Sequence, residues 1–597
     1  MVGRLAFVVF TLAFMLAWMP YLHLDTKVKA YAAEIIVPDQ YSTIQAAIDN
    51  ANDLDTIFVR SGTYYEHVVV NKTIAFIGED RNTVIIDGGG TGVVVNIAAN
   101  GVNMTGFTVR RSGTGGYIGD DPPMDPPVYP KTAGVYLRNV TNCRLFENNV
   151  VETYVGIQLE HGANHNVIAN NTLRNNTWAG IGTHEACWNS FLSNNVTDNL
   201  DSVMVRVDSN NNTFSENIIT ATNWGVTIDR CYNNTISRNH IRSSNIGINL
   251  QKSDSNGIFG NDFRDNYVGI QVFTSQHNNV SENDLTRNYC AVEITDYSSD
   301  NEVFGNNVTE NSYGVGFWFS DRNIVYENNI SRNGLYGVLV SYSRDNKFYY
   351  NNFVGSTQQM SISSHYFNSL DKGYPSGGNY WSDYVGKDSL NGPLQNETGC
   401  DGIGDIPYAI DGNNMDMYPL IKPYGSSHDV GAMVTVSKTV LAEGYNTTVA
   451  FNVTVINYGA QTEDFNFSFE MPGTDFETVL SLENRESTTF TFTLNTTEFL
   501  LGNYTASTFV STVPGESDTA DNNRTVNLRV VIPGDVSSTT QGVPDGTVNM
   551  RDINYSILLF NTKPSTPKWN PNADVNNDQI VNMRDIQIAI LNFNKHE

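Results

Sequence analysis

Four ionisable residues recur at one position of a sequence repeat that runs from about residue 143 to residue 351. Each lies four residues after the glycine of its repeat, or after the residue that replaces that glycine: Glu160, His184, Arg206 and Asp229. Two carboxylates a few ångström apart can cleave a glycoside by general acid-base catalysis, and histidine or arginine can take a proton beside a sugar acid. We therefore treat these four as candidate catalytic residues. Phe273 and Trp318 occupy the same position in later repeats and could stack on sugar rings.

The alternative is a solvated face on which opposite charges simply pair, since exposed ionisable columns are usually of that kind. A neighbouring row adds more charged residues: His161, Glu185, Arg230 and Lys252. The sequence carries none of the compact signatures of pectate lyases or polygalacturonases. Whether the row turns over a substrate is therefore left open.

The repeat itself is marked by asparagines spaced 22 or 23 residues apart: Asn148, Asn171, Asn194, Asn217, Asn239, Asn261, Asn283, Asn306, Asn328 and Asn351. A period of this length with short β-rich segments predicts a solenoid in which each repeat is one coil. We interpret residues 34–424 as a right-handed parallel β-helix. Asparagine tolerates the left-handed conformation at corners, and its amide can bond to identical amides in adjacent coils. The ladder is thus expected to be scaffold.

Both ends of the solenoid need covers, because unpaired strand edges invite aggregation. Residues 42–51 have the apolar spacing of a short helix that would close the first end. Residues 366–424 would close the second. This second segment contains four aspartates: Asp383, Asp388, Asp401 and Asp405. They could bind a cation or form Asx turns, and we favour turns in a structural cap.

Composition and charge limit the kinds of molecule that this protein can bind. The 597 residues include 63 acidic and 35 basic side chains, a formal charge of −28, which argues against nucleic acid as a partner. The five cysteines form no CxxC pair and are expected to be mostly free, buried thiols. Residues 1–32, with Arg4 before an apolar run, predict a signal peptide, with an uncleaved anchor as the alternative. The mature protein is expected to be secreted or extracellular, without a transmembrane anchor.

Residues 428–532 change character, with alternating valine, threonine and phenylalanine that predict a β-sandwich. The segments Asn457-Tyr458-Gly459 and Asp521-Asn522-Asn523 resemble adhesion-type, Ig-like modules of secreted proteins. Such modules act as spacers or binders, and this one shows no catalytic constellation.

Residues 534–597 contain the hexapeptide Val-Asn-Met-Arg-Asp-Ile twice, 33 residues apart, each copy leading into an expected helix at 553–560 or 586–593. The second copy completes a calcium loop with ligands at Asp574, Asn576, Asp578, Ile580 (main chain), Asn582 and Asp585. The first copy offers Asp535, Asp545, Asn549 and Asp552, but an insertion after Asp535 puts that site in doubt. This duplicated unit resembles a type I dockerin, which implies calcium as cofactor and a cohesin-bearing partner.

The solenoid also resembles a known family. The segments that carry the likeness are Ile36-Val37-Pro38, Ile44-Gln45-Ala46-Ala47-Ile48, Asp55-Thr56-Ile57, Gly62-Thr63-Tyr64-Tyr65-Glu66 and Phe76-Ile77-Gly78. They are similar to the opening of NosD-like, pectin-lyase-like β-helix proteins, over roughly residues 34–424.

Three functions follow from these observations. We prefer an exported protein that binds or degrades polysaccharide through its β-helix. The NosD-like resemblance implies copper handling or metalloenzyme maturation instead, although copper favours clustered His, Met or Cys and the ten histidines are dispersed in sequence. A non-catalytic surface or adhesion protein is the third.

Overall fold

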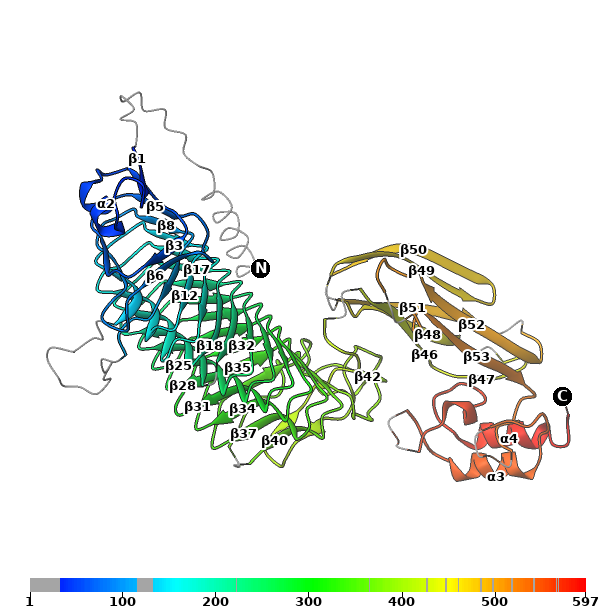
Figure 1. Ribbon diagram of the computed structural model, residues 1–597. Coiled ribbons are helices and arrows are strands. Elements are labelled where there is room, and N and C mark those ends of the chain that lie inside the picture. Colours follow the sequence, from blue (N-terminus) through cyan, green and yellow to red (C-terminus); the bar gives the residue numbers. More distant parts are fainter. Residues whose placement is uncertain are drawn as a thin grey trace.

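The computed structural model describes residues 33–596, except 115–131 and short gaps at 222, 364–365, 426–427, 446–447, 460, 484–485, 496–498, 517–518, 539, 541–542, 565 and 567 (Figure 1). The signal peptide predicted at 1–32 lies outside the described residues. Among the helices described, none is long and apolar enough to cross a membrane.

A parallel β-helix forms the N-terminal part of the protein, as the repeat predicts. Strands β1 (Glu34–Val37) to β41 (Tyr380–Trp381) build three parallel sheets of 14, 13 and 14 strands (Figure 1). Sheet A runs from β1 to β38 (Lys347–Tyr349), and sheet B runs from β3 (Gly62–Tyr64) to β41. Each coil contributes one short strand to each sheet, so residues one repeat apart lie side by side.

The third sheet, sheet C, carries the residues of interest. Its strands are β4 (Val68–Val70), β7 (Val95–Ile97), β10 (Ala133–Arg138), β13 (Val155–Glu160), β16 (Ala179–His184), β19 (Asp201–Arg206), β22 (Trp224–Asp229), β25 (Ile246–Gln251), β28 (Val268–Phe273), β31 (Cys290–Thr295), β34 (Tyr313–Trp318), β37 (Tyr336–Ser341) and β40 (Gln358–Ile362). Alternate side chains such as Ile157 and Leu159 enter one continuous apolar core.

The asparagine ladder is confirmed, with one correction. Asn261 donates from Nδ2 to Asn283 Oδ1 at 2.9 Å, while its own Oδ1 accepts the main-chain N–H of Asn239 at 2.9 Å. The left-handed residue of each corner, however, is the one before the ladder asparagine, such as Gly260 (φ 64°). The ladder residues are therefore selected for their buried amide hydrogen bonds, rather than for an unusual backbone conformation.

Helix α2 (Ile44–Asn50) covers the first end, and its N-cap Thr43 accepts the N–H of Ala46 as the sequence predicts. At the other end the ladder finishes on Asp416, whose Oδ2 accepts the N–H of Asn379 at 2.7 Å. In the same cap Asp388 accepts the N–H groups of Asp401 and Gly402. These bonds agree with a structural cap held by turns.

Residues 430–531 form two sheets that enclose a separate core. The first contains β46 (Val430–Val436), β48 (Thr448–Asn457) and β51 (Ser487–Asn495). The second contains β47 (Val440–Ala442), β53 (Asn523–Val531), β52 (Gly502–Val510), β49 (Glu463–Met471) and β50 (Thr474–Leu482). The Ig-like identity of this unit stays a prediction.

The C-terminal unit contains α3 (Met550–Leu558), a short 3-10 turn at Pro571–Ala573, and α4 (Met583–Leu591). Both helices begin three residues earlier than expected, because Asn549 and Asn582 are N-caps, each closed into a capping box by the aspartate three residues later. The unit packs on the sandwich: buried Lys438 donates to the main-chain oxygen of Asp574, and Ala442 joins an apolar cluster with Val575.

Candidate functional site

The strand register of sheet C aligns the four ionisable residues in one column, as the sequence predicts. Glu160 pairs with His184, His184 with Arg206, and Arg206 with Asp229, on the consecutive strands β13, β16, β19 and β22. The row is not a solvated face, however. Glu160 is 1% exposed, His184 9% and Asp229 8%, so all three are buried.

One part of the catalytic hypothesis is wrong. Glu160 and Asp229 are three strands apart, which at ~4.8 Å a strand separates them by about 14 Å. Glycosidase carboxylates lie at most about 10 Å apart. Asp229 instead accepts from the adjacent Arg230 at 3.0 Å. The two carboxylates therefore do not form an acid-base pair.

Glu160 has a different partner. Its Oε2 accepts the phenol O–H of Tyr136 at 2.6 Å, and its Oε1 has no hydrogen bond within the described part of the chain. Burial raises the pKa of Glu160, although the Tyr136 hydrogen bond opposes that shift. A carboxyl group of this kind can hold a proton closer to neutral pH than an exposed glutamate can.

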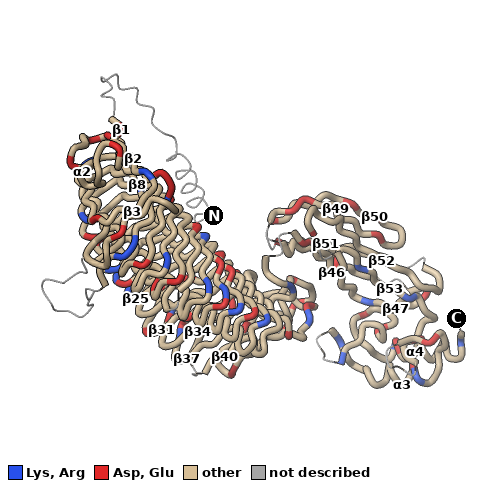
Figure 2. Tube along the Cα trace, in the orientation of Figure 1, with Lys and Arg blue, Asp and Glu red and all other residues tan. Residues whose placement is uncertain are grey.

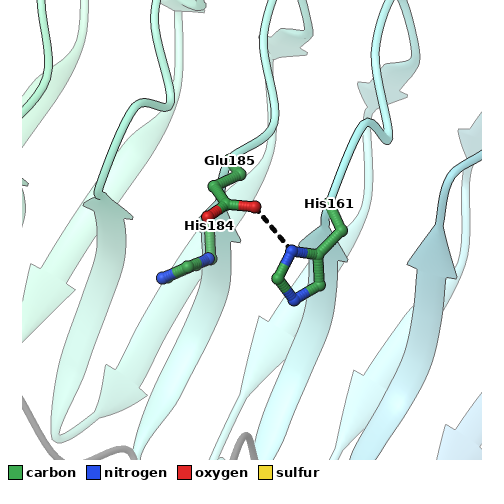
Figure 3. A group of neighbouring side chains, drawn as sticks. All are labelled: His161, His184 and Glu185. Atoms are coloured by element: carbon green, nitrogen blue, oxygen red, sulfur yellow. Dashed lines mark hydrogen bonds and ion pairs between the residues drawn. The ribbon is translucent and has the colours of Figure 1, made fainter. Parts of the chain in front are cut away.

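His184 lies at the centre of a cluster with His161 and Glu185 (Figure 3). His161 Nδ1 lies 2.6 Å from Glu185 Oε2, and the two imidazole rings are 5.5 Å apart in an edge arrangement. One ligand atom from each residue falls within 4.8 Å of the others. Two imidazoles and a carboxylate are a donor set that suits copper or zinc.

Burial also sets the charge of this cluster. It lowers the pKa of His184 to about 4, so the ring is neutral at neutral pH, which is the form of imidazole that binds a metal. Arg206 lies with its guanidinium 5.6 Å from the centre of the Trp178 ring. Gln158 and Met204 are among the residues that line a cavity of about 10 Å³ beside His184, which is about the size of one water molecule.

The two predicted aromatic residues occupy the same column as the ionisable row, on β28 and β34. Both are half-buried. Trp318 lines a groove in sheet C of about 420 Å³, whereas Phe273 is not among the residues that line it.

Ligand-type side chains converge in the second predicted calcium loop. Asp574, Asp578 and Asp585 bring carboxylate oxygens within 4.8 Å of one another. Asn576 and Asn582 both hydrogen-bond to the carboxylate of Asp578, at 3.1 and 3.0 Å. Gln579, which replaces the turn glycine, adopts φ 65°.

The first loop repeats part of this construction. Asp552 accepts the N–H groups of Val536 and Ser537, as Asp585 accepts those of Val575 and Asn576. Within the described residues its carboxylates do not form a comparable ligand group. Calcium binding at either loop stays a prediction.

Sequence reasoning did not identify Tyr136, and it placed His161 and Glu185 in a neighbouring charged row rather than among the candidate catalytic residues. A signal for the last two was present, because each directly follows a member of the ionisable row. Both adopt left-handed conformations, φ 43° and 49°, which turn them towards the same edge of sheet C. Over the whole solenoid, acidic and basic residues are interspersed (Figure 2).

A model of the family described as "Periplasmic copper-binding protein (NosD)" matches residues 48–272 and 264–386. No protein with a curated description matches the chain. Among solved structures, the A-module of mannuronan C-5 epimerase AlgE4 from Azotobacter vinelandii is similar at 13% identity and a TM-score of 0.38, covering 55% of this chain and 96% of that one.

Two other solved structures are similar to different parts of the chain. The Dettilon tailspike protein (gp208) matches at 12% identity and a TM-score of 0.39, over 73% of this chain and 84% of its own. The CARDB domain of the Pyrococcus furiosus protein PF1109, solved with di-metal ions, matches at 20% identity and a TM-score of 0.16, over 18% and 94%. None of these scores supports an inference about function.

Proposed function

This chain belongs to the NosD family, whose model covers residues 48–386, and on that premise we propose that its solenoid binds copper outside the cytoplasm. One observation carries the proposal: His161, His184 and Glu185 converge at one edge of sheet C (Figure 3). The family description indicates copper as the metal, and the three side chains of the cluster are its candidate ligands.

The donor set fits copper(II) in particular. Imidazole nitrogen and carboxylate oxygen suit that ion, and the square arrangements it favours accept three protein ligands and a solvent molecule. His184 stays neutral because burial lowers its pKa, while Glu185, 45% exposed at its side chain, keeps the cluster open to solvent. The histidines that are dispersed in sequence are thus brought together by stacking of coils.

Titration of metal-free full-length protein with copper(II) tests this function, in the presence of calcium. We expect one tight site, with nitrogen hyperfine splitting in the electron paramagnetic resonance spectrum. His161→Ala and His184→Ala should each weaken it more than tenfold. His240→Ala is the matched control, because His240 also pairs with a carboxylate, Asp262, at 3.2 Å. Equal copper affinity in all four proteins would refute the site.

A second candidate function is acid-base chemistry on a polysaccharide. The observation in its favour is the buried Glu160–Tyr136 pair beside a neutral His184 and the Arg206 guanidinium. A protonated carboxyl and a neutral imidazole can exchange protons with a sugar without a second carboxylate.

Incubation with uronic-acid and neutral glycans, followed by assays for unsaturated products and reducing ends, tests this second function. Glu160→Gln should abolish any product, whereas Asp229→Asn, three strands away, should leave it. Absence of product from every glycan would remove the acid-base function and leave binding to be tested separately.

The C-terminal unit supports attachment to a partner. We propose that its loops bind calcium and that its helices dock on a cohesin-type protein at the cell surface or on a secreted complex. The supporting observation is a duplicated apolar surface: Met550, Ile557 and Leu558 of α3 are 53–55% exposed, and the residues 33 positions later on α4, Met583, Ile590 and Leu591, are 52–79% exposed. Calcium-dependent capture of the full chain by an immobilised cohesin tests the attachment, with Asp574→Ala as the variant expected to lose it.

A further inference from the structure

A groove crosses the outer face of sheet C from strand β25 to strand β37, and it begins three strands from His184 along the solenoid. At ~4.8 Å a strand, it begins about 14 Å from the proposed copper cluster. Its volume of about 420 Å³ falls in the range of small-molecule sites. The cavity beside His184 holds about 10 Å³, so of these two sites the groove is the one that can accommodate an oligomeric ligand.

Aromatic side chains form the walls. On one side Tyr267 and Tyr289 stack with ring centres 4.6 Å apart, and Tyr289 meets Tyr313 edge to face at 5.4 Å. Tyr267 is 56% exposed and Tyr289 44%, which is apolar surface that a folded chain normally covers. Trp318 lines the groove from the opposite column of the sheet.

A glycine in the floor gives the Trp318 ring its position. A Cβ added at Gly316 would lie 2.2 Å from the indole, so the ring occupies the space directly above this residue. Gly316 takes the place that Gln271 and Glu293 occupy on the two preceding strands. The indole therefore lies over the floor, where it can stack on a ring bound in the groove.

Polar groups in the floor set the charge that the groove accepts. Gln271 Nε2 donates to Glu293 Oε2 at 2.6 Å. Burial raises the pKa of Glu293, and the nearby Asp296 carboxylate adds to that shift. Of the described residues that line the groove, none is basic. A uronic-acid polymer would thus find no cation in this lining to pair with its carboxylates, whereas a neutral sugar can hydrogen-bond to both floor residues.

We propose that this groove binds a neutral, hexose- or pentose-based glycan, with Trp318 and the tyrosine wall stacking on its sugar rings. The inference deepens the glycan function proposed above, because it names a substrate class and a location. Binding of a glycan in this groove requires neither catalytic turnover nor a bound metal.

Calorimetric titration of the full-length protein tests the proposal. The probes are β-1,4-linked hexasaccharides of glucose, mannose and xylose, with hexagalacturonate as the charged comparison. At least one neutral hexasaccharide should bind, and hexagalacturonate should bind at least tenfold more weakly. Trp318→Ala and Tyr289→Ala should each weaken neutral binding about tenfold, since stacking contributes on the order of 1 kcal/mol.

Three further variants sharpen the result. Gly316→Ala should weaken binding like Trp318→Ala, because its methyl group displaces the indole, whereas Trp318→Phe should retain most of the affinity. Trp188→Ala, which removes a 55% exposed aromatic outside the groove, should change nothing. No binding of any neutral hexasaccharide, tighter binding of hexagalacturonate, or full affinity in Trp318→Ala would each overturn the proposal. Glu160→Gln should keep the binding, so loss of turnover and failure of the groove are distinguishable.

Discussion

His161 Nδ1 lies 2.6 Å from Glu185 Oε2, across the gap between two adjacent coils, and both residues project from turns rather than from strands. The side chains are 25% and 45% exposed. A pair this open contributes about 1 kcal/mol or less to folding. The pair therefore contributes little to stability, and the copper site proposed above assigns it a role in binding instead.

Glu185→Gln separates these two roles. The amide keeps a hydrogen-bond acceptor for His161 but removes the negative charge that favours a cation. We expect copper(II) affinity to fall more than tenfold, while the free energy of unfolding changes by less than about 1 kcal/mol. Calorimetric copper titration and thermal denaturation measure the two effects on the same sample. A large loss of stability with unchanged copper affinity would assign the pair a structural role instead.

Tyr136→Phe tests the buried carboxyl. The substitution removes the one hydrogen bond found for the Glu160 carboxyl group in the described structure, and leaving a buried carboxyl unpaired costs about 1–3 kcal/mol. Thermal denaturation should show the loss at pH 8 and a smaller one at pH 4, where Glu160 is protonated and needs the donor less. Tyr297→Phe, at a residue 74% exposed, is the control expected to have no effect. Equal losses at both pH values would contradict the role of the Tyr136 hydroxyl.

Asn261→Ala tests the ladder. The side chain bridges three coils: its Nδ2 donates to Ile236 O and Asn283 Oδ1, and its Oδ1 accepts from Asn239. Removing it leaves several buried polar groups unpaired, so we expect a loss of at least about 3 kcal/mol. Hydrogen exchange followed by mass spectrometry should show faster exchange in the two adjacent coils. Asn329→Ala, an exposed asparagine on sheet B, should leave exchange unchanged.

The solenoid and the alignment of the ionisable row could be predicted because coil stacking converts spacing in the sequence into position on the sheet. Glu160, His184, Arg206 and Asp229 fall in one column as the glycine register predicts. The burial of that column could not be predicted, since it depends on side chains such as Tyr136 and Trp178 from neighbouring columns. The three-strand separation of the two carboxylates follows from the same register.

The proposed copper cluster and the groove could not be predicted for a different reason. His161 and Glu185 come together because their turns adopt positive φ, a local geometry that alternation along strands does not reveal. The tyrosines of the groove wall precede the register glycines by one or two residues, as Tyr267 precedes Gly269. That recurrence could have indicated an aromatic column, but the space between it and Trp318 depends on Gly316 and on three-dimensional packing.

Asp416, the last residue of the asparagine ladder, makes the stability of the solenoid depend on pH. Asp416 is fully buried where earlier coils place asparagine, and it accepts the N–H groups of Asn379 and Tyr418 and the indole N–H of Trp381. Burial nevertheless raises its pKa to about 7, from 3.8. Because the folded pKa exceeds the unfolded one, the folded state binds more protons over this interval. The stability from this group is present in full below about pH 4 and is lost as pH rises to about 7.

Asp416→Asn should remove that part of the pH dependence. The amide cannot ionise. Its NH₂ group faces the N–H of Tyr418, which lowers the stability of the variant at every pH. The informative quantity is therefore the change in stability with pH rather than its absolute value. Calorimetric unfolding from pH 4 to pH 8 should show a shallower decline in the solenoid transition of the variant than in that of the native protein. Parallel declines would mean that Asp416 stays ionised throughout, held by its three donors, and that other carboxyl groups cause the pH dependence.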